Sequence, residues 1–124
     1  MVEEVYKRKF KLWFYQVSHS EAIIRSPKRQ LEKTYDTNID IYLGDIVYME
    51  MPTVIQELQI INATAEDANY LTGKLGKAVS MEKIIIFISR GKKYYVVASI
   101  IKIMENDLDY GVLPIQTFLE YKKE

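Results

Sequence analysis

The chain contains no cysteine and only one histidine, together with few of the residues that interrupt regular structure, five glycines and three prolines. Without cysteine the protein can form no disulfide, iron–sulfur cluster or thiolate zinc site, and it has no cysteine nucleophile. With His19 as the sole histidine, a zinc site would have to be built largely from carboxylates. We therefore predict no metal site and no cofactor.

An excess of either charge is also missing, because 17 basic residues balance 17 acidic residues. Domains that bind duplex nucleic acid usually present a net basic face, so this balance argues against a nucleic-acid partner. The longest apolar runs, residues 84–88 and 94–98, are far shorter than the about 20 residues of a membrane helix. The charged start of the chain lacks the apolar core of a signal peptide. We predict no membrane partner and a cytoplasmic protein of bacterial type.

The apolar content, 48% of the 124 residues, is ordinary for a globular protein. A chain of this length fits one domain, and it shows no internal repeat or linker. We therefore predict a single domain over residues 1–124, in which residues 1–9 form a polar lead-in.

Most of the chain predicts short β-strands. Residues 10–17 are dense in aromatic side chains, which favour a pleated sheet. Residues 18–21 predict a turn and residues 22–26 a returning strand, so the two strands would form a hairpin that Pro27 ends. By alternation, one face of the first strand would carry Phe10, Leu12 and Phe14, and the other would carry Lys11, Trp13, Tyr15 and Val17.

Further strands are predicted after a polar loop at residues 27–38. Residues 39–43 alternate, with Ile39, Ile41 and Leu43 pointing inward and Asp40 and Tyr42 outward. Gly44-Asp45 marks a turn or bulge before a strand at residues 46–51, and a short strand is expected at residues 58–61.

One helix is expected at residues 62–76, where Thr64 is a suitable N-cap and Gly76 a C-terminal stop. The clearest hairpin joins residues 84–89 to residues 93–104 through Arg90-Gly91-Lys92. The second arm is long enough to bend or to cross two neighbours, and residues 84–88 need a central place in the sheet or a subunit interface. Residues 105–111 predict a polar turn. Residues 114–121 form either a helix or a strand, and Pro114 favours the helix.

Together these elements predict an α+β fold that is mainly β. We expect a curved antiparallel sheet or partly open barrel of six to seven strands with one or two short helices. The helix that starts at Thr64 would cover one side or end of the sheet.

No sequence motif points to catalysis. Ser18-His19-Ser20 lacks the nucleophile elbow of serine hydrolases, and the glycines of residues 72–77 end a helix instead of opening a phosphate loop. We therefore predict no catalytic residue and lean towards a protein that is not an enzyme.

The leading hypothesis is a non-enzymatic protein-interaction domain, either a subunit or an inhibitor-like partner, that binds another protein or forms a homo-oligomer. The ten tyrosines support it, because tyrosine is enriched at interfaces, and Tyr42 and Tyr48 are the candidate interface residues. One alternative is a small-molecule binding or catalytic barrel whose mouth is lined by Trp13, Tyr15, His19 and Arg25. A second is a single-stranded nucleic-acid module that uses basic residues near Trp13 and Tyr15.

Overall fold

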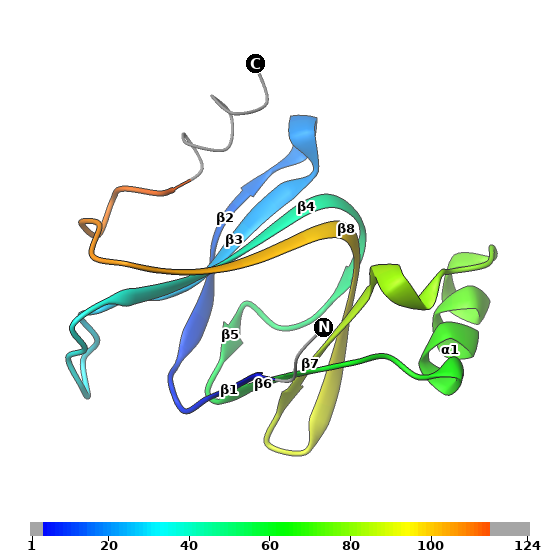
Figure 1. The fold of residues 1–124 in the computed structure, drawn as a ribbon, viewed down its shortest axis with the longest axis horizontal. Helices are drawn as coiled ribbons and strands as arrows, with labels where there is room; N and C mark the ends of the chain where they lie inside the picture. The colour runs from blue at the N-terminus through cyan, green and yellow to red at the C-terminus, as the bar shows by residue number, and fades with distance from the viewer. Residues whose placement is uncertain (1–3, 115–124) are drawn as a thin grey trace.

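The computed structural model describes residues 4–114, which form one antiparallel sheet of eight strands, one α-helix and two short 3-10 turns (Figure 1). The strands are β1 (Glu4–Tyr6), β2 (Phe10–Gln16), β3 (Glu21–Ser26), β4 (Asn38–Glu50), β5 (Val54–Ile55), β6 (Leu58–Ile61), β7 (Ile84–Ser89) and β8 (Lys92–Asn106). The other elements are α1 (Ala65–Leu75), η1 (Val17–His19) and η2 (Met81–Lys83). The strand order is β1-β6-β7-β8-β4-β3-β2-β5. The predicted α+β, mainly β class is confirmed, with slightly more strands than expected.

The sheet is strongly curved, so that both of its ends reach the same apolar core (Figure 1). The long strands β4 and β8 pair from Asn38↔Asn106 to Glu50↔Tyr95 and belong to both halves of the sheet. Near one end Phe10 enters the core from β2, and near the other end Leu58 enters it from β6. The predicted curved antiparallel sheet is therefore confirmed.

Alternation explains which side chains fill this inner core. Ile39, Ile41 and Leu43 of β4 all belong to it, as the sequence predicted, whereas Asp40 and Tyr42 lie on the outer face. Strand β7 pairs with β6 on one side and β8 on the other, so the apolar run at residues 84–88 is central, as expected.

Helix α1 forms where the sequence predicts it and packs on the outer face of β7 and β8. Thr64 is the N-cap, and its side chain and the carboxylate of Asp67 form a reciprocal capping box. Gly76 ends the helix in the left-handed conformation with a φ of 71°. Leu71 is completely buried against Ile84 and Val97. Within residues 4–114, no helix is long and apolar enough to span a membrane.

The turn between β7 and β8 confirms the predicted hairpin. Arg90 and Gly91 both have positive φ, 50° and 79°. A two-residue hairpin turn of type I′ needs positive φ at both positions, and its twist matches that of the flanking strands. The hairpin of β2 and β3 is confirmed too, with η1 at its tip.

The prediction for Phe14 was wrong, because a β-bulge interrupts β2. Leu12 pairs with Ile24 and Phe14 with Ile23, so Trp13 is the extra residue of the bulge. The extra residue shifts the alternation by one position. Phe14 consequently joins Ile23 on the outer face instead of Leu12 in the inner core.

Three further strands differ from those expected from the sequence. The polar lead-in contains β1, which pairs with β6, and β5 was not predicted. The strands expected at residues 39–43 and 46–51 are one strand, because Gly44 and Asp45 bend β4 without ending its pairing with β8. The helix or strand expected at residues 114–121 lies outside the described residues, apart from Pro114.

Candidate functional site: a basic aromatic pocket

A segment that follows β8, residues 107–112, crosses the outer face of the sheet; we name it the strap. The side chain of Asn38 on β4 donates to the carbonyl of Leu108 at 2.9 Å. Arg25 on β3 donates to the carbonyls of Tyr110 at 3.2 Å and Val112 at 2.8 Å. Side chains of the neighbouring strands β4 and β3 thus hold every second carbonyl from Leu108 to Val112.

Arg25 and Asp40 form a buried ion pair beneath the strap. Arg25 Nε lies 2.7 Å from Asp40 Oδ1 and Arg25 Nη2 lies 2.9 Å from Asp40 Oδ2, and both side chains are fully buried. Asn106 Nδ2 donates to Asp40 at 2.8 Å, and Asn38 Nδ2 donates to Asn106 Oδ1 at 2.9 Å. We name these four residues the polar latch, because they join the strap to the sheet.

The loop between β3 and β4 lies beside the strap, and Lys28 Nζ of the loop donates to the carbonyl of Asp107 at 2.6 Å. The guanidinium of Arg8 anchors this loop by donating to Ser26 and Thr37 and by lying 3.8 Å from the ring centre of Tyr35. Gln30 Nε2 donates to the carbonyls of Lys9, at 3.3 Å, and Pro27, at 3.1 Å. These contacts hold the loop against the sheet, although it contains no helix or strand.

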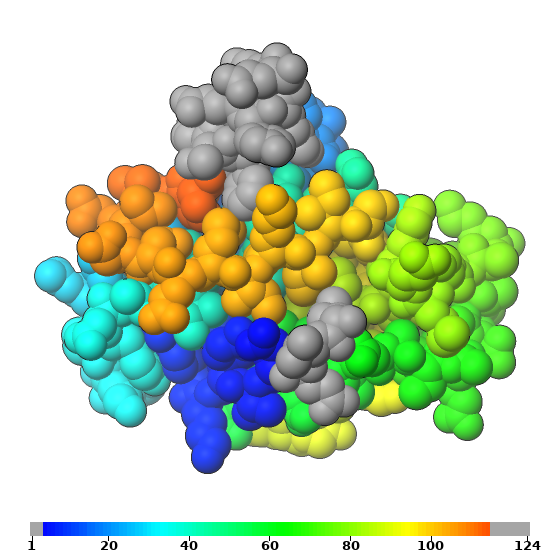
Figure 2. Space-filling model, viewed as in Figure 1, coloured from blue at the N-terminus to red at the C-terminus, as the bar shows by residue number. Residues whose placement is uncertain are grey.

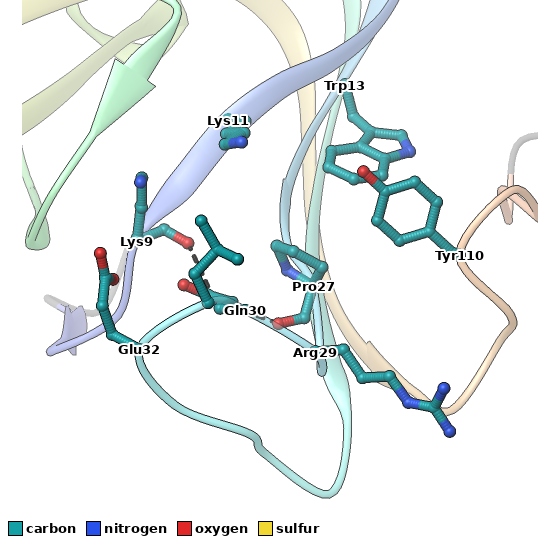
Figure 3. Close-up of a pocket in the computed structure, with 9 residues that line it drawn as sticks. Lys9, Lys11, Trp13, Pro27, Arg29, Gln30, Glu32 and Tyr110 are labelled. Carbon is teal, nitrogen blue, oxygen red and sulfur yellow. Dashed lines mark hydrogen bonds between the residues drawn. The ribbon is translucent and has the colours of Figure 1, made fainter.

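A hollow of about 370 Å³ lies between the loop, β2 and the strap (Figure 3). This volume is at the lower end of the range for ligand pockets, roughly 300–1,000 Å³. We name it the basic aromatic pocket. Its lining residues are Lys9, Lys11, Trp13, Pro27, Arg29, Gln30, Leu31, Glu32 and Tyr110.

Two aromatic rings form one side of the basic aromatic pocket. Trp13 and Tyr110 meet edge to face, with ring centres 4.8 Å apart and planes at 74°. Figure 3 shows both rings together on one side of the hollow, with Lys9 and Glu32 on the other. Because Trp13 is the bulged residue of β2 and Tyr110 is carried by the strap, this wall depends on two irregular features.

The charged residues of the pocket are mostly basic. Lys9 is half-buried, Lys11 and Arg29 are exposed, and Glu32 is the one acidic residue that the described part of the chain contributes to the lining. A smaller hollow next to it brings Asp109 close to Arg29. The pocket can therefore attract an anionic group while its ring wall and the fully exposed Leu31 contact an apolar group.

The structure brings together only some of the predicted ligand residues. Trp13 lines the pocket, and Arg25 lies behind it, with its guanidinium carbon 5.7 Å from the Trp13 ring centre. Arg25 is fully buried and its nitrogens are taken up by Asp40 and the strap. Tyr15 is 45% exposed and lies outside the lining. His19 is exposed in η1 at the tip of the hairpin, beside a different hollow lined by residues 18–20 and 45–47.

The two predicted interface tyrosines lie on the outer face but in different surroundings. Tyr42 is only 1% exposed, and its hydroxyl donates to the buried carboxylate of Glu21 at 2.6 Å. Burial and then this hydrogen bond raise the pKa of Tyr42. Tyr48 is half-buried next to α1, where its hydrogen bond to Glu50 and its burial raise its pKa to about 12. Of the two tyrosines, only Tyr48 has a partly exposed side chain that a partner protein could contact.

Sequence reasoning missed Tyr110 as a site residue. Lys9 and Lys11 are distant from Arg29 in the sequence, and their meeting in one hollow follows from the pairing of β2 with β3. Tyr110 reaches Trp13 across 97 positions in the sequence, 110 − 13, and no local pattern signals that contact. Among residues 4–114, no group of three or more histidine or acidic side chains could hold a metal ion.

Comparisons with known proteins do not add a function to this geometry. No family model, curated protein or solved structure matches this chain.

Proposed function

We propose that this protein is a non-enzymatic interaction domain that binds an acidic segment of a partner protein in its basic aromatic pocket. The observation that carries the proposal is the lining itself, in which Lys9, Lys11 and Arg29 surround an apolar wall. Lysine and arginine attract carboxylates, and a concave apolar surface receives one aromatic or aliphatic anchor side chain.

The orientation of the rings favours a peptide over a single-stranded nucleic acid. A nucleic-acid platform needs free aromatic faces on which bases stack. Trp13 already contacts Tyr110 edge to face and has the Arg25 guanidinium near its ring. An acidic peptide needs only the cationic rim and a space for its anchor, and the pocket offers both.

The small-molecule alternative has less support from the geometry. It required Trp13, His19 and Arg25 to line one cavity. Of four hollows formed by residues 4–114, one has His19 in its lining and none has Arg25. Arg25 instead holds the strap, and His19 stays exposed at the hairpin tip.

Trp13 provides a direct probe, because it is the only tryptophan in the chain. We expect a short synthetic peptide of glutamate and serine with one central phenylalanine to change its fluorescence saturably. Raising the salt concentration should weaken binding, because the exposed charges are screened. A single-stranded oligonucleotide that binds more tightly than the peptide, or a peptide that leaves the fluorescence unchanged, contradicts the proposal.

A charge-reversal pair locates the binding. Lys11→Glu places an acidic group on the rim and should weaken peptide binding about tenfold, which corresponds to about 1.4 kcal/mol. Lys77→Glu is the matched control, because Lys77 is exposed just beyond α1 and the change in net charge is identical. Equal weakening by both variants would point to a general charge effect and not to the pocket.

The cytoplasm of a bacterial-type cell remains the proposed location, since a cysteine-free chain needs no oxidising compartment. Cell fractionation tests it, and a secreted protein would contradict it.

Sedimentation with and without the peptide separates a hetero-partner from a second copy of this chain. Self-association that the peptide reverses would favour the second copy.

A further inference from the structure

The strap is attached to the sheet differently from every strand. Among residues 4–114, its one backbone–backbone hydrogen bond outside the strand ladders is from Val112 N to Asp109 O, at 2.9 Å, within the strap itself. Five of its six residues, Asp107, Asp109, Tyr110, Gly111 and Val112, are exposed. A segment with few buried contacts and no ladder opens locally at a lower free energy than the whole fold.

Side chains of the sheet provide the attachment. Lys28 Nζ donates to the carbonyl of Asp107 at 2.6 Å, and Arg25 and Asn38 of the polar latch donate to carbonyls farther along. Figure 2 shows the strap, in orange, on the surface next to the loop of residues 27–37, in cyan. Opening of the strap would let water replace these donors.

The strap also carries a wall of the basic aromatic pocket. Tyr110 is 66% exposed, and its only ring partner among the described residues is Trp13. When the strap opens, Tyr110 leaves Trp13 and the pocket loses one side. A ligand that touches Tyr110 therefore contacts the closed strap and not the open one.

We propose that the strap is a closable wall of the basic aromatic pocket: an acidic ligand selects the closed strap and holds it closed through Tyr110. This inference rests on the proposed function. By linkage, a ligand that binds one of two states shifts their populations by its difference in affinity. Peptide binding and strap closure must then support each other.

Hydrogen exchange at the Val112 amide measures strap opening in the unaltered protein. Among residues 4–114 this amide is bonded only to Asp109 O, in a turn whose carbonyls at Tyr110 and Val112 are held by Arg25. When the strap leaves the sheet this support is lost, the exposed turn opens and the amide exchanges. At a peptide concentration of about ten times Kd, we expect its exchange to slow about tenfold. The Lys83 amide is bonded to Ser80 O in the short turn η2, outside the pocket, so it exchanges by local opening and should keep its rate.

A variant of the polar latch tests the reverse direction. Asn106→Ala removes the donor to Asp40 and the acceptor of Asn38, and Asn106 does not line the pocket. We expect Val112 to exchange about tenfold faster and the peptide to bind several-fold more weakly. Glu105→Gln is the control, because Glu105 is exposed on the same strand, bonds to Thr37 and should change binding less than twofold.

The outcomes separate the inference from the proposed function. If the wild-type protein does not bind the peptide, both are overturned. If the peptide binds and shifts Trp13 but Val112 exchanges at its original rate, the strap is a fixed wall and only the inference is overturned. Should Asn106→Ala fail to fold, the wild-type exchange experiment still decides.

Discussion

Two segments cover the outer face of the curved sheet, and they are attached in contrasting ways. Helix α1 lies at one end of the molecule and packs through apolar side chains such as Leu71 against Ile84 and Val97 (Figures 1 and 2). The strap lies towards the other end and is held mainly by hydrogen bonds centred on Arg25 and Asp40. The helix cover is regular and mainly apolar, although Asp67 also accepts hydrogen bonds from Lys93 and Tyr95 of β8. The strap is irregular and held mainly by polar contacts.

The difference indicates what each cover does. Apolar packing is non-directional, so the contact of Leu71 with Ile84 and Val97 stabilises the sheet without orienting a particular surface side chain. Hydrogen bonds are directional, and a buried pair that loses one partner is costly. While the strap is closed, the polar latch therefore sets the position of Tyr110, and with it the geometry of the basic aromatic pocket.

The largest effect is expected from breaking the polar latch. Arg25→Ala leaves the carboxylate of Asp40 buried and without its cation, which should lower the free energy of unfolding by about 3–5 kcal/mol. Denaturant unfolding measures this. A loss below about 1 kcal/mol would mean that water or a rearranged side chain readily compensates Asp40.

Loss of helix packing should have the next largest effect. Leu71 is completely buried, so Leu71→Ala should cost about 2–4 kcal/mol in unfolding free energy. Because α1 lies far from the pocket, peptide affinity should change less than about twofold. Weakened binding in this variant, measured where it is fully folded, would show that the two covers are not independent.

The pH dependence of stability should include a contribution from Asp67 at the start of α1. Burial acts to raise the pKa of this carboxyl, but hydrogen bonds from Thr64, Lys93 and Tyr95 outweigh it, so the net effect is a pKa below the ordinary 3.8. The folded state thus favours the carboxylate. Its stabilisation is present at neutral pH and is lost as the pH falls through and below 3.8.

Asp67→Asn tests this pH dependence. It should cost about 1 kcal/mol at neutral pH through the weakened capping box, and less in acid. Unfolding measured at both pH values gives the comparison. An equal cost at both would assign the effect to packing instead of charge.

The smallest effect should be a gain in stability within the helix cover. Gly73 lies inside α1, and a Cβ built there meets no atom within 4 Å. Gly73→Ala should raise the free energy of unfolding by about 0.5–1 kcal/mol, since alanine is the better helix former. Thermal unfolding measures it, and a lower melting temperature would argue against the exposed position of Gly73.

The two covers also differ in how well the sequence predicted them. Residues 62–76 contain a cap, a helical spacing and a stop signal, all of which are local, and α1 formed there. The hairpin around Arg90 and Gly91 was equally local. Alternation placed Ile39, Ile41 and Leu43 correctly because no bulge interrupts that part of β4.

The strap and pocket could not be predicted in the same way. From the sequence, residues 105–111 were predicted only as a polar turn. The residues that hold the strap, Arg25 and Asn38, are distant in the sequence, so no local pattern indicates them. The bulge at Trp13 has no local signature, and it changed the face of Phe14. Arg25 was chosen as a ligand residue for its charge, whereas its burial beside Asp40 depends on the pairing of β3 with β4.

The most direct test of the polar latch as the support of the binding site uses the double variant Arg25→Met, Asp40→Leu. It leaves the net charge unchanged and replaces the ion pair by apolar side chains, a replacement that is often tolerated in buried pairs. The carbonyls of Tyr110 and Val112 lose their donor. We expect the double variant to regain most of the stability lost in Arg25→Ala but to bind the acidic peptide at least about tenfold more weakly than the wild type, as measured by Trp13 fluorescence. A stable double variant with wild-type affinity would contradict the account.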